Sequence, residues 1–461
     1  MQEGRFLTGS TFGHVVRMTA TGAFGITFVF LVDAANLLWL SQLGQPELVA
    51  AIGFAYAIQF FSVSIGVGLM IATTAMISRS IGRGEHEHAR TQAGASVAIS
   101  AMLQGCVALA ILFFRHDLVT MAGATGQTAD NAAGYLAMTI MSLIPMAISL
   151  SCSGTLRAYG YGKEAMYVTL TSGLILMVID PILILYLEWG LDGAGIGLVL
   201  FRFCLMGLAV YFAVYKFALV TRPNITTIRA VLIPFAVIAG PAIATQMSTP
   251  VGNYILTIVM APFGDDAVAA WAVVARLTVL AFGGIFALSG AIGGIFGQNY
   301  GAGQYDRLRS TYRDALIFCL FYTLLMWAVL ASATNLIISA FALSGQGEDV
   351  LRAFTSIGVG GFVFVGALFV SNAAFNNLGK PGRSTLVNWL KDGAISWPAA
   401  TVLSASFGAA GVIYGQAVAG IIMGTLAAVW GWRYVAGLNG AVDAKVAKLR
   451  PYPNPDRYRS R

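Results

Sequence analysis

Apolar stretches long enough to cross a lipid bilayer follow one another along almost the whole chain, and they limit the possible folds more than any other feature. A membrane-spanning helix needs about 20 predominantly apolar residues, and in lipid only helices or closed barrels satisfy every backbone polar group. Of the 461 residues, 57% are hydrophobic and only 10% are charged, which excludes an ordinary soluble domain. We predict an all-α polytopic membrane protein with twelve transmembrane helices, near 14–38, 47–77, 91–114, 134–158, 166–187, 193–218, 231–260, 267–297, 311–335, 352–378, 385–407 and 410–435.

The basic residues predict how these helices cross the membrane. All of the 27 lysines and arginines except Arg115, Arg202, Arg276 and Arg352 fall at one side of the predicted spans, while acidic residues collect in the opposite loops. The positive-inside rule assigns the basic side to the cytoplasm. We therefore expect a multi-pass protein of a bacterial inner membrane with cytoplasmic N- and C-termini. The basic tail at 436–461 is expected to contact membrane lipids and no nucleic acid.

The two halves of the chain resemble each other in sequence. Val49-Ala50-Ala51 recurs as Val268-Ala269-Ala270 after a shift of 219 residues, and Gly82 recurs as Gly301 after the same shift. Because each half has six predicted spans, both halves enter the membrane from the same side and form a parallel repeat. We expect an N-terminal six-helix lobe at 1–220, a cytoplasmic inter-lobe linker at 221–230 and a C-terminal six-helix lobe at 231–435. Such duplication favours a transporter over a membrane enzyme.

Two carboxylates, Asp33 and Asp180, fall inside apolar spans, whereas nearly all other acids are expected in loops, in the tail or at membrane edges. A charge at mid-membrane costs about 2.5–3.5 kcal/mol on insertion scales, so it usually faces a cavity or a pathway. Both acids are expected near the outward ends of their helices, where they can share one chamber. We predict that they bind the coupling cation. The alternative is a structural acid bonded to a neighbouring amide or hydroxyl, and Asp180, which precedes Pro181, fits this alternative better than Asp33 does.

Several short motifs, in the expected order along nearly the whole chain, resemble those of multidrug and toxic-compound extrusion (MATE) transporters. Each motif is weak alone, and their combination is specific. They are Leu31-Val32-Asp33, Leu43-Gly44, Val49-Ala50-Ala51-Ile52-Gly53, Ser78-Arg79-Ser80-Ile81-Gly82-Arg83-Gly84, Ile179-Asp180-Pro181-Ile182-Leu183-Ile184, Gly190-Leu191-Asp192-Gly193-Ala194-Gly195, Gly297-Gln298-Asn299-Tyr300-Gly301-Ala302-Gly303 and Phe407-Gly408-Ala409-Ala410-Gly411.

The resemblance implies two six-helix lobes in a V and alternating access that exports organic compounds against inward proton or sodium flow. In the branch resembling DinF proteins, the coupling acids lie on helices 1 and 5, and Asp33 and Asp180 occupy those positions. The branch resembling NorM proteins has additional acids on helices 7 and 10, whose cores carry no carboxylate in this chain. The resemblance therefore favours the DinF-like branch.

The chain also departs from the family pattern at three positions. Leu176 stands where an Asn often precedes the fifth-helix Asp, and Leu198 replaces a sixth-helix Thr of a sodium site. A first-helix proline is replaced by Gly22, with Gly25 one turn later, so these glycines are the candidates for helix bending. A sodium ion needs several oxygen ligands, so the two leucines favour H+ as the coupling ion over Na+.

Other polar residues in the spans are weaker candidates. Asn36, one turn from Asp33, and Tyr135 are expected to support the acids, although simple packing explains them equally well. Lys391 and Asp392 are interpreted as a pair near the cytoplasmic end of helix 11, and a similar edge position is the default for Arg202. A possible substrate cavity, with membrane core as the alternative, comprises Met138, Met141, Gln246, Asn253, Tyr254, Arg276, Asn372 and Asn376.

Together these features predict a proton-coupled antiporter that exports small organic compounds and is not an enzyme. We expect it to work as a monomer, with no cofactor and no metal site. A sodium-coupled MATE exporter and a lipid-linked substrate flippase of the same superfamily remain the alternatives.

Overall fold

The computed structural model describes residues 4–439, and its first group of helices forms the N-terminal lobe. Several membrane-crossing spans of this lobe are built from more than one helical segment. The elements are α1 (Thr11–Ser41), α2 (Pro46–Gly82), α3 (His86–Phe113), the short α4 (Arg115–Met121), α5 (Gly126–Thr139), η1 (Ile140–Ser142), α6 (Leu143–Ala158), α7 (Gly162–Pro181), η2 (Ile182–Tyr186), α8 (Gly190–Val210) and η3 (Tyr211–Lys216).

The C-terminal lobe follows the same plan, with breaks in its second, fourth and fifth membrane-crossing spans. Its elements are α9 (Ile225–Met260), η4 (Ala261–Phe263), α10 (Asp265–Ala291), α11 (Gly293–Gly301), α12 (Tyr305–Ala340), α13 (Gln346–Ala353), η5 (Phe354–Gly358), α14 (Phe362–Asn377), α15 (Pro381–Trp389), η6 (Leu390–Ile395), α16 (Ser396–Phe407) and α17 (Ala410–Ala436).

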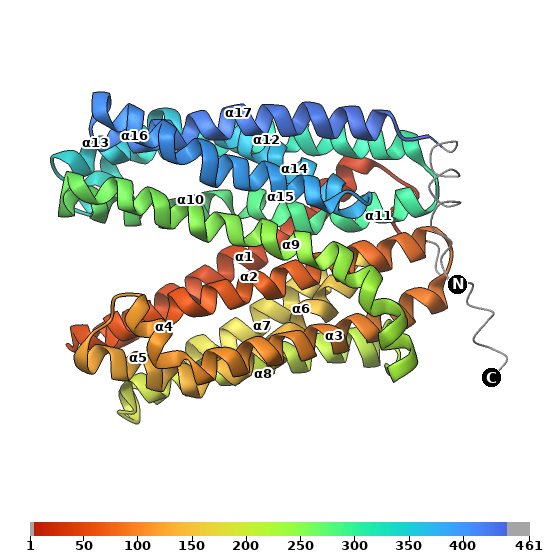
Figure 1. The fold of residues 1–461 in the computed structure, drawn as a ribbon, viewed down its shortest axis with the longest axis horizontal. Helices are drawn as coiled ribbons and strands as arrows, with labels where there is room; N and C mark the ends of the chain where they lie inside the picture. The colour runs from red at the N-terminus through yellow and green to blue at the C-terminus, as the bar shows by residue number, and fades with distance from the viewer. Residues whose placement is uncertain (1–3, 440–461) are drawn as a thin grey trace.

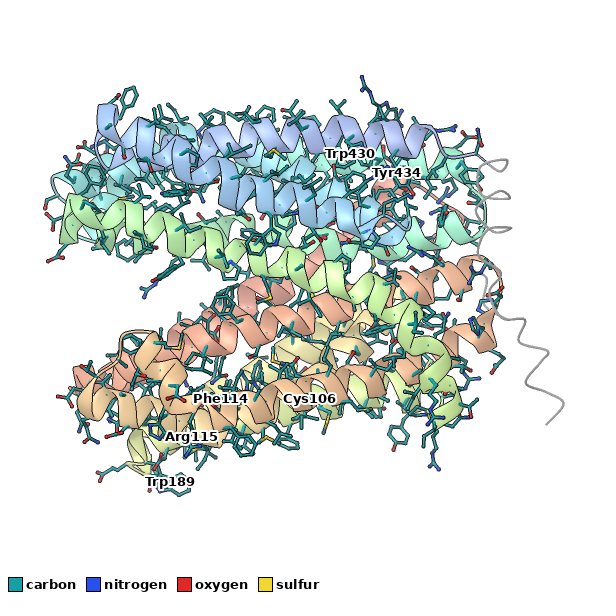
Figure 2. The ribbon with its side chains drawn as sticks, in the orientation of Figure 1. Cys106, Phe114, Arg115, Trp189, Trp430 and Tyr434 are labelled. Atoms are coloured by element: carbon teal, nitrogen blue, oxygen red, sulfur yellow. The ribbon has the colours of Figure 1, made fainter. Side chains whose placement is uncertain are left out.

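Most of these spans are long and apolar enough to cross a bilayer. Within the described range, ten helices are long and apolar enough, and the α13–α14 pair, bent by 61°, makes an eleventh. The remaining span, α15–η6–α16, contains the charged Lys391-Asp392 pair. Phe114 and Trp189 lie in one half of the long axis, and Trp430 and Tyr434 lie in the other (Figure 2).

The linker between the lobes is shorter than expected. The sequence suggested a linker over 221–230, whereas α9 already begins at Ile225. Asn224 caps this helix, because its side chain accepts a 2.7 Å hydrogen bond from the backbone N–H of Thr227. The Thr227 hydroxyl in turn accepts from the backbone N–H of Asn224, which completes a capping box. Of the tail predicted at 436–461, residues 440–461 lie outside the described residues.

The two lobes form a V (Figure 1). They meet at the end of the molecule where α2 approaches α11, and they diverge toward the end that carries α4, α5 and α13. Helix α1 packs against α7 of its own lobe and against α10 of the other. The described parts of both chain ends lie at the closed end of the V. There Arg307 donates a 2.8 Å hydrogen bond to the backbone carbonyl of Phe6, and Arg309 donates a 3.1 Å hydrogen bond to that of Leu438.

Glycines allow the close contact between the lobes. A Cβ added at Gly82 would lie 2.0 Å from the backbone oxygen of Gln298, and one added at Gly301 would lie 2.2 Å from the backbone oxygen of Arg79. Only a residue without a side chain permits backbones to approach so closely. The paired glycines of the internal repeat therefore form the contact that closes one end of the V.

Candidate functional site

Asp180 lies at a local break in its helix. Pro181 has no backbone N–H, so it cannot continue the regular hydrogen-bond ladder, and α7 passes into the π-helical turn η2 at this point. The residue is only 1% exposed. Asn36 Nδ2 on α1 donates a 2.7 Å hydrogen bond to Asp180 Oδ2, whereas the buried Oδ1 has no hydrogen-bond partner. A carboxylate oxygen that is buried without a partner is costly unless a proton or another cation compensates for it.

Gly197 on α8 makes room for this carboxylate. A Cβ at this position would lie 2.1 Å from Asp180 Oδ1. Gly197 was not a predicted site residue, because nothing in a single sequence distinguishes it from the many other glycines of the spans.

Asp33 lies on α1, one helical turn before Asn36, and is partly buried. It interacts electrostatically with Arg202 and with Asp180. The structure therefore brings the two acids into one region between α1, α7 and α8. The sequence predicted that these two acids share one chamber.

The position of Arg202 on α8 differs from the one predicted. It was expected to extend to a membrane edge, but it is 4% exposed and its guanidinium lies inside the N-terminal lobe. It donates to Gln59 Oε1 at 2.5 Å, to Ser142 Oγ at 2.9 Å and to the backbone oxygen of Thr139 at 3.2 Å. An arginine inside a predicted span was the available signal, since a charge in that position is expensive unless it has partners.

Two tyrosines complete the region. Tyr135 on α5 is buried and interacts electrostatically with Arg202, Asp180 and Asp33. Tyr56 on α2 is exposed and interacts with Asp33. We use the name coupling chamber for the set Asp33, Asn36, Tyr56, Gln59, Tyr135, Asp180 and Arg202.

The leucines that replace family oxygens are packed beside the acids. Leu176 is buried, and its Cδ1 would lie 3.3 Å from a Cβ at Gly197. Leu198 packs against the same apolar cluster as Leu176. Neither side chain offers an oxygen. Within residues 4–439, no group of three or more His, Cys, Asp or Glu side chains is placed to hold a metal ion.

The two glycines suggested as bending points lie in a continuous helix, since α1 runs unbroken from Thr11 to Ser41. A Cβ at Gly22 would lie 2.9 Å from Ala287 Cβ on α10, so this glycine permits close packing between the lobes. Gly25 is less crowded, with Thr169 Oγ1 at 4.0 Å from the corresponding Cβ position.

The residues suggested for a substrate cavity differ in burial. Asn253, Tyr254 and Arg276 are exposed, and Met138 and Gln246 are partly buried. Met141 is 38% exposed.

Asn372 and Asn376 lie in the packed interior of the C-terminal lobe. Asn372 Oδ1 accepts from Asn388 at 3.0 Å, and the backbone oxygen of Asn376 accepts from Arg79 at 3.1 Å. These two asparagines therefore join α15 and α2 to α14.

The sequence suggested that Lys391 and Asp392 lie near the cytoplasmic end of helix 11. The structure places them elsewhere. The helix begins at Pro381, so the pair lies roughly 15 Å along it, near its middle. Asp392 is buried, forms an ion pair with Lys391 and accepts a 3.0 Å hydrogen bond from Ser248 Oγ. Asp392 is therefore a third acid inside the membrane-crossing region, in the lobe opposite the coupling chamber.

Comparison with known proteins identifies the family. The family model described as MatE matches residues 23–182 and 241–391. The FAD transporter of Shewanella oneidensis is 22% identical over 92% of this chain and 95% of its own length, and the multidrug export protein MepA of Staphylococcus haemolyticus is 20% identical over 92% and 93%.

Solved structures agree with this fold. The bent form of the Vibrio cholerae MATE transporter VcmN has a TM-score of 0.84 and 25% identity over 92% of this chain and 97% of that one. An outward-facing multidrug resistance MATE transporter has a TM-score of 0.88 and 21% identity over 95% and 98%. The prediction of an all-α protein with twelve transmembrane helices in two lobes is thus confirmed. Because the family model covers more than half of the chain, the protein belongs to the MATE family of membrane transporters and is not an enzyme.

Proposed function

We propose that the protein is a secondary active antiporter of the DinF-like branch that exports small organic compounds in exchange for protons by alternating access. The observation that carries this proposal is the environment of Asp180, a buried carboxylate with one unpartnered oxygen beside a second acid. A proton on this pair removes an uncompensated charge from the membrane interior. Leu176 and Leu198 provide none of the oxygens that a sodium ion would need, so a proton fits the chamber better.

In the proposed cycle, the chamber is deprotonated when the transporter loads its substrate from the cytoplasm. Protonation of the acid pair from outside then removes its uncompensated charge, α1 shifts between the lobes, and the substrate leaves. Each inward positive charge supplies about 2.3 kcal/mol per 100 mV of membrane potential. The relatives are named as an FAD transporter and a multidrug export protein, and we carry over only the class of small organic compounds.

The membrane setting is part of the proposal. We assign the protein to a bacterial inner membrane, with both termini in the cytoplasm, as a monomer. In this orientation the closed end of the V faces the cytoplasm and the open end faces outward. The support is the distribution of basic residues together with the two described chain ends at the closed end.

Efflux from proteoliposomes under separately imposed proton and sodium gradients tests the coupling ion. The substrates would be a fluorescent organic cation and a flavin dinucleotide. A pH gradient alone should drive efflux in the native protein, and Asp33→Asn or Asp180→Asn should abolish it. Asp192→Asn is the matched control, since this exposed acid lies on α8 outside the chamber. Efflux driven only by sodium would support the sodium-coupled alternative, and undiminished pH-driven efflux in both variants would refute the proposed mechanism.

A further inference from the structure

Arg202 brings a permanent positive charge into the coupling chamber. Arginine stays protonated in proteins, and its planar guanidinium suits buried sites where several acceptors converge. Its three hydrogen bonds use Gln59, Ser142 and the Thr139 carbonyl, all of which are uncharged. None of these acceptors neutralises the cation. Asp33, which interacts electrostatically with Arg202, can supply a compensating charge.

The chamber acids are placed to supply such a charge. Gly197, on the same helix as Arg202, packs against the Asp180 carboxylate, since a Cβ there would lie 2.1 Å from Asp180 Oδ1. Arg202 interacts electrostatically with Asp33 on α1 and with Tyr135 on α5, and Tyr135 also interacts with Asp180 on α7. The titratable groups that face this region are therefore Asp33, Tyr56, Tyr135 and Asp180, and the fixed cation is Arg202. With both acids ionised, the net charge of the chamber is negative by one. One proton makes it neutral.

We propose that Arg202 is a fixed counter-ion that limits the chamber to one exchangeable proton per transport cycle. This inference rests on the proposed proton antiport and adds its stoichiometry. The proton is shared by the Asp33–Asp180 pair, as expected for interacting acids. Arg202 acts through the acids and does not itself bind the transported compound, so it is a positioning residue.

The proposal leads to a charge rule for variants: the number of protonated acids equals the number of acids minus the number of fixed cations. The native chamber should hold one protonated acid and one carboxylate near neutral pH. Arg202→Gln should hold two protonated acids. Asp33→Asn and Asp180→Asn should each hold none, because the remaining acid stays ionised opposite Arg202. The double variant Asp33→Asn with Arg202→Gln should again hold one protonated acid.

Infrared difference spectroscopy of the purified protein counts these acids through the carbonyl stretch of the protonated carboxyl group. Arg202→Lys keeps the charge, and Ser142→Ala removes one hydrogen bond while keeping the charge, so both should match the native count. A purely structural Arg202 predicts an unchanged count in Arg202→Gln and a persistent signal in both single Asp→Asn variants. Either result would overturn the proposal. If Arg202→Gln does not fold, the two single Asp→Asn variants still decide the question.

Transport gives an independent measure of the stoichiometry. With the membrane potential clamped at zero, a difference of about one pH unit should balance about a tenfold substrate gradient for one proton and about a hundredfold gradient for two. We expect the tenfold balance in the native protein and the hundredfold balance in Arg202→Gln. A native hundredfold balance would contradict the counter-ion role while leaving proton antiport intact. A missing pH-driven flux together with the expected infrared counts would refute the antiport, and its stoichiometry with it, while the counter-ion role of Arg202 would stand.

Discussion

Arg79 of α2 donates a 2.8 Å hydrogen bond from Nε to the backbone carbonyl of Asn377, the last residue of α14 in the opposite lobe. A second bond runs from Nη2 to the carbonyl of Asn376 at 3.1 Å. The last carbonyls of a helix lack intrahelical partners, and this end of the helix attracts positive charge. Arg79 therefore joins the two lobes at the closed end of the V.

Replacing Arg79 should loosen this closed end. Hydrogen bonds from a charged donor contribute about 1.5–3 kcal/mol each, so Arg79→Gln should raise the population of molecules open on this side by about tenfold or more. Spin labels at the exposed positions Glu87 and Asp306 would report the separation of the lobes. Arg83→Gln is the control, because Arg83 pairs with Glu85 of its own lobe at 3.1 Å. Identical distance distributions in the Arg79 and Arg83 variants would contradict the role of Arg79.

The glycine contact at the same end can be tested separately. Gly82→Ala places a methyl group 2.0 Å from the Gln298 backbone oxygen, which forces the lobes apart, whereas Gly53→Ala on the same helix meets nothing within 4 Å. We expect Gly82→Ala to shift the spin-label distances toward the open form and to slow transport, with Gly53→Ala unchanged. Equal behaviour of the two alanine variants would show that the close approach of the backbones does not control closure.

The sequence predicted the elements well because hydrophobicity and charge sidedness are properties of whole segments. It also placed Asp33, Asn36 and Asp180 close together, since their depth follows from helix rise and their faces from helical periodicity. It misjudged Arg202 and the Lys391–Asp392 pair for a shared reason. The partners of a buried charge come from other helices: Gln59 and Ser142 for Arg202, and Ser248 for Asp392. A single sequence does not reveal such contacts.

Gly197 allows a direct test of the carboxylate position. In Gly197→Ala the new methyl group would lie 2.1 Å from Asp180 Oδ1, so the carboxylate must move and its hydrogen bond with Asn36 must lengthen or break. We expect loss of pH-driven transport and a loss of stability of about 1–3 kcal/mol, typical of overpacking. Gly207→Ala on the same helix, with nothing within 4 Å, should retain both activity and melting temperature. Full transport by the Gly197 variant would indicate that the position of Asp180 is not critical.

The membrane orientation can be measured in intact cells with an impermeant maleimide. Glu87 and Asp349 are exposed and lie at opposite ends of the lobes, at the start of α3 and within α13. In a background without the native cysteines, Asp349→Cys should react from outside and Glu87→Cys should react only after the membrane is permeabilised. The reverse pattern would invert the assigned topology.

The Lys391–Asp392 pair should behave as a coupled unit in the C-terminal lobe. Removing one partner of a buried ion pair leaves an uncompensated charge and costs about 3–5 kcal/mol, with a smaller loss here because the Lys391 side chain keeps 16% of its exposure. Asp392→Asn should therefore lower the melting temperature, and it also weakens the charge-assisted bond from Ser248. The double variant Lys391→Met with Asp392→Asn leaves no charge and should recover most of the loss. Thermal unfolding of the single and double variants forms a double-mutant cycle, and additive effects would mean that the two side chains do not stabilise each other.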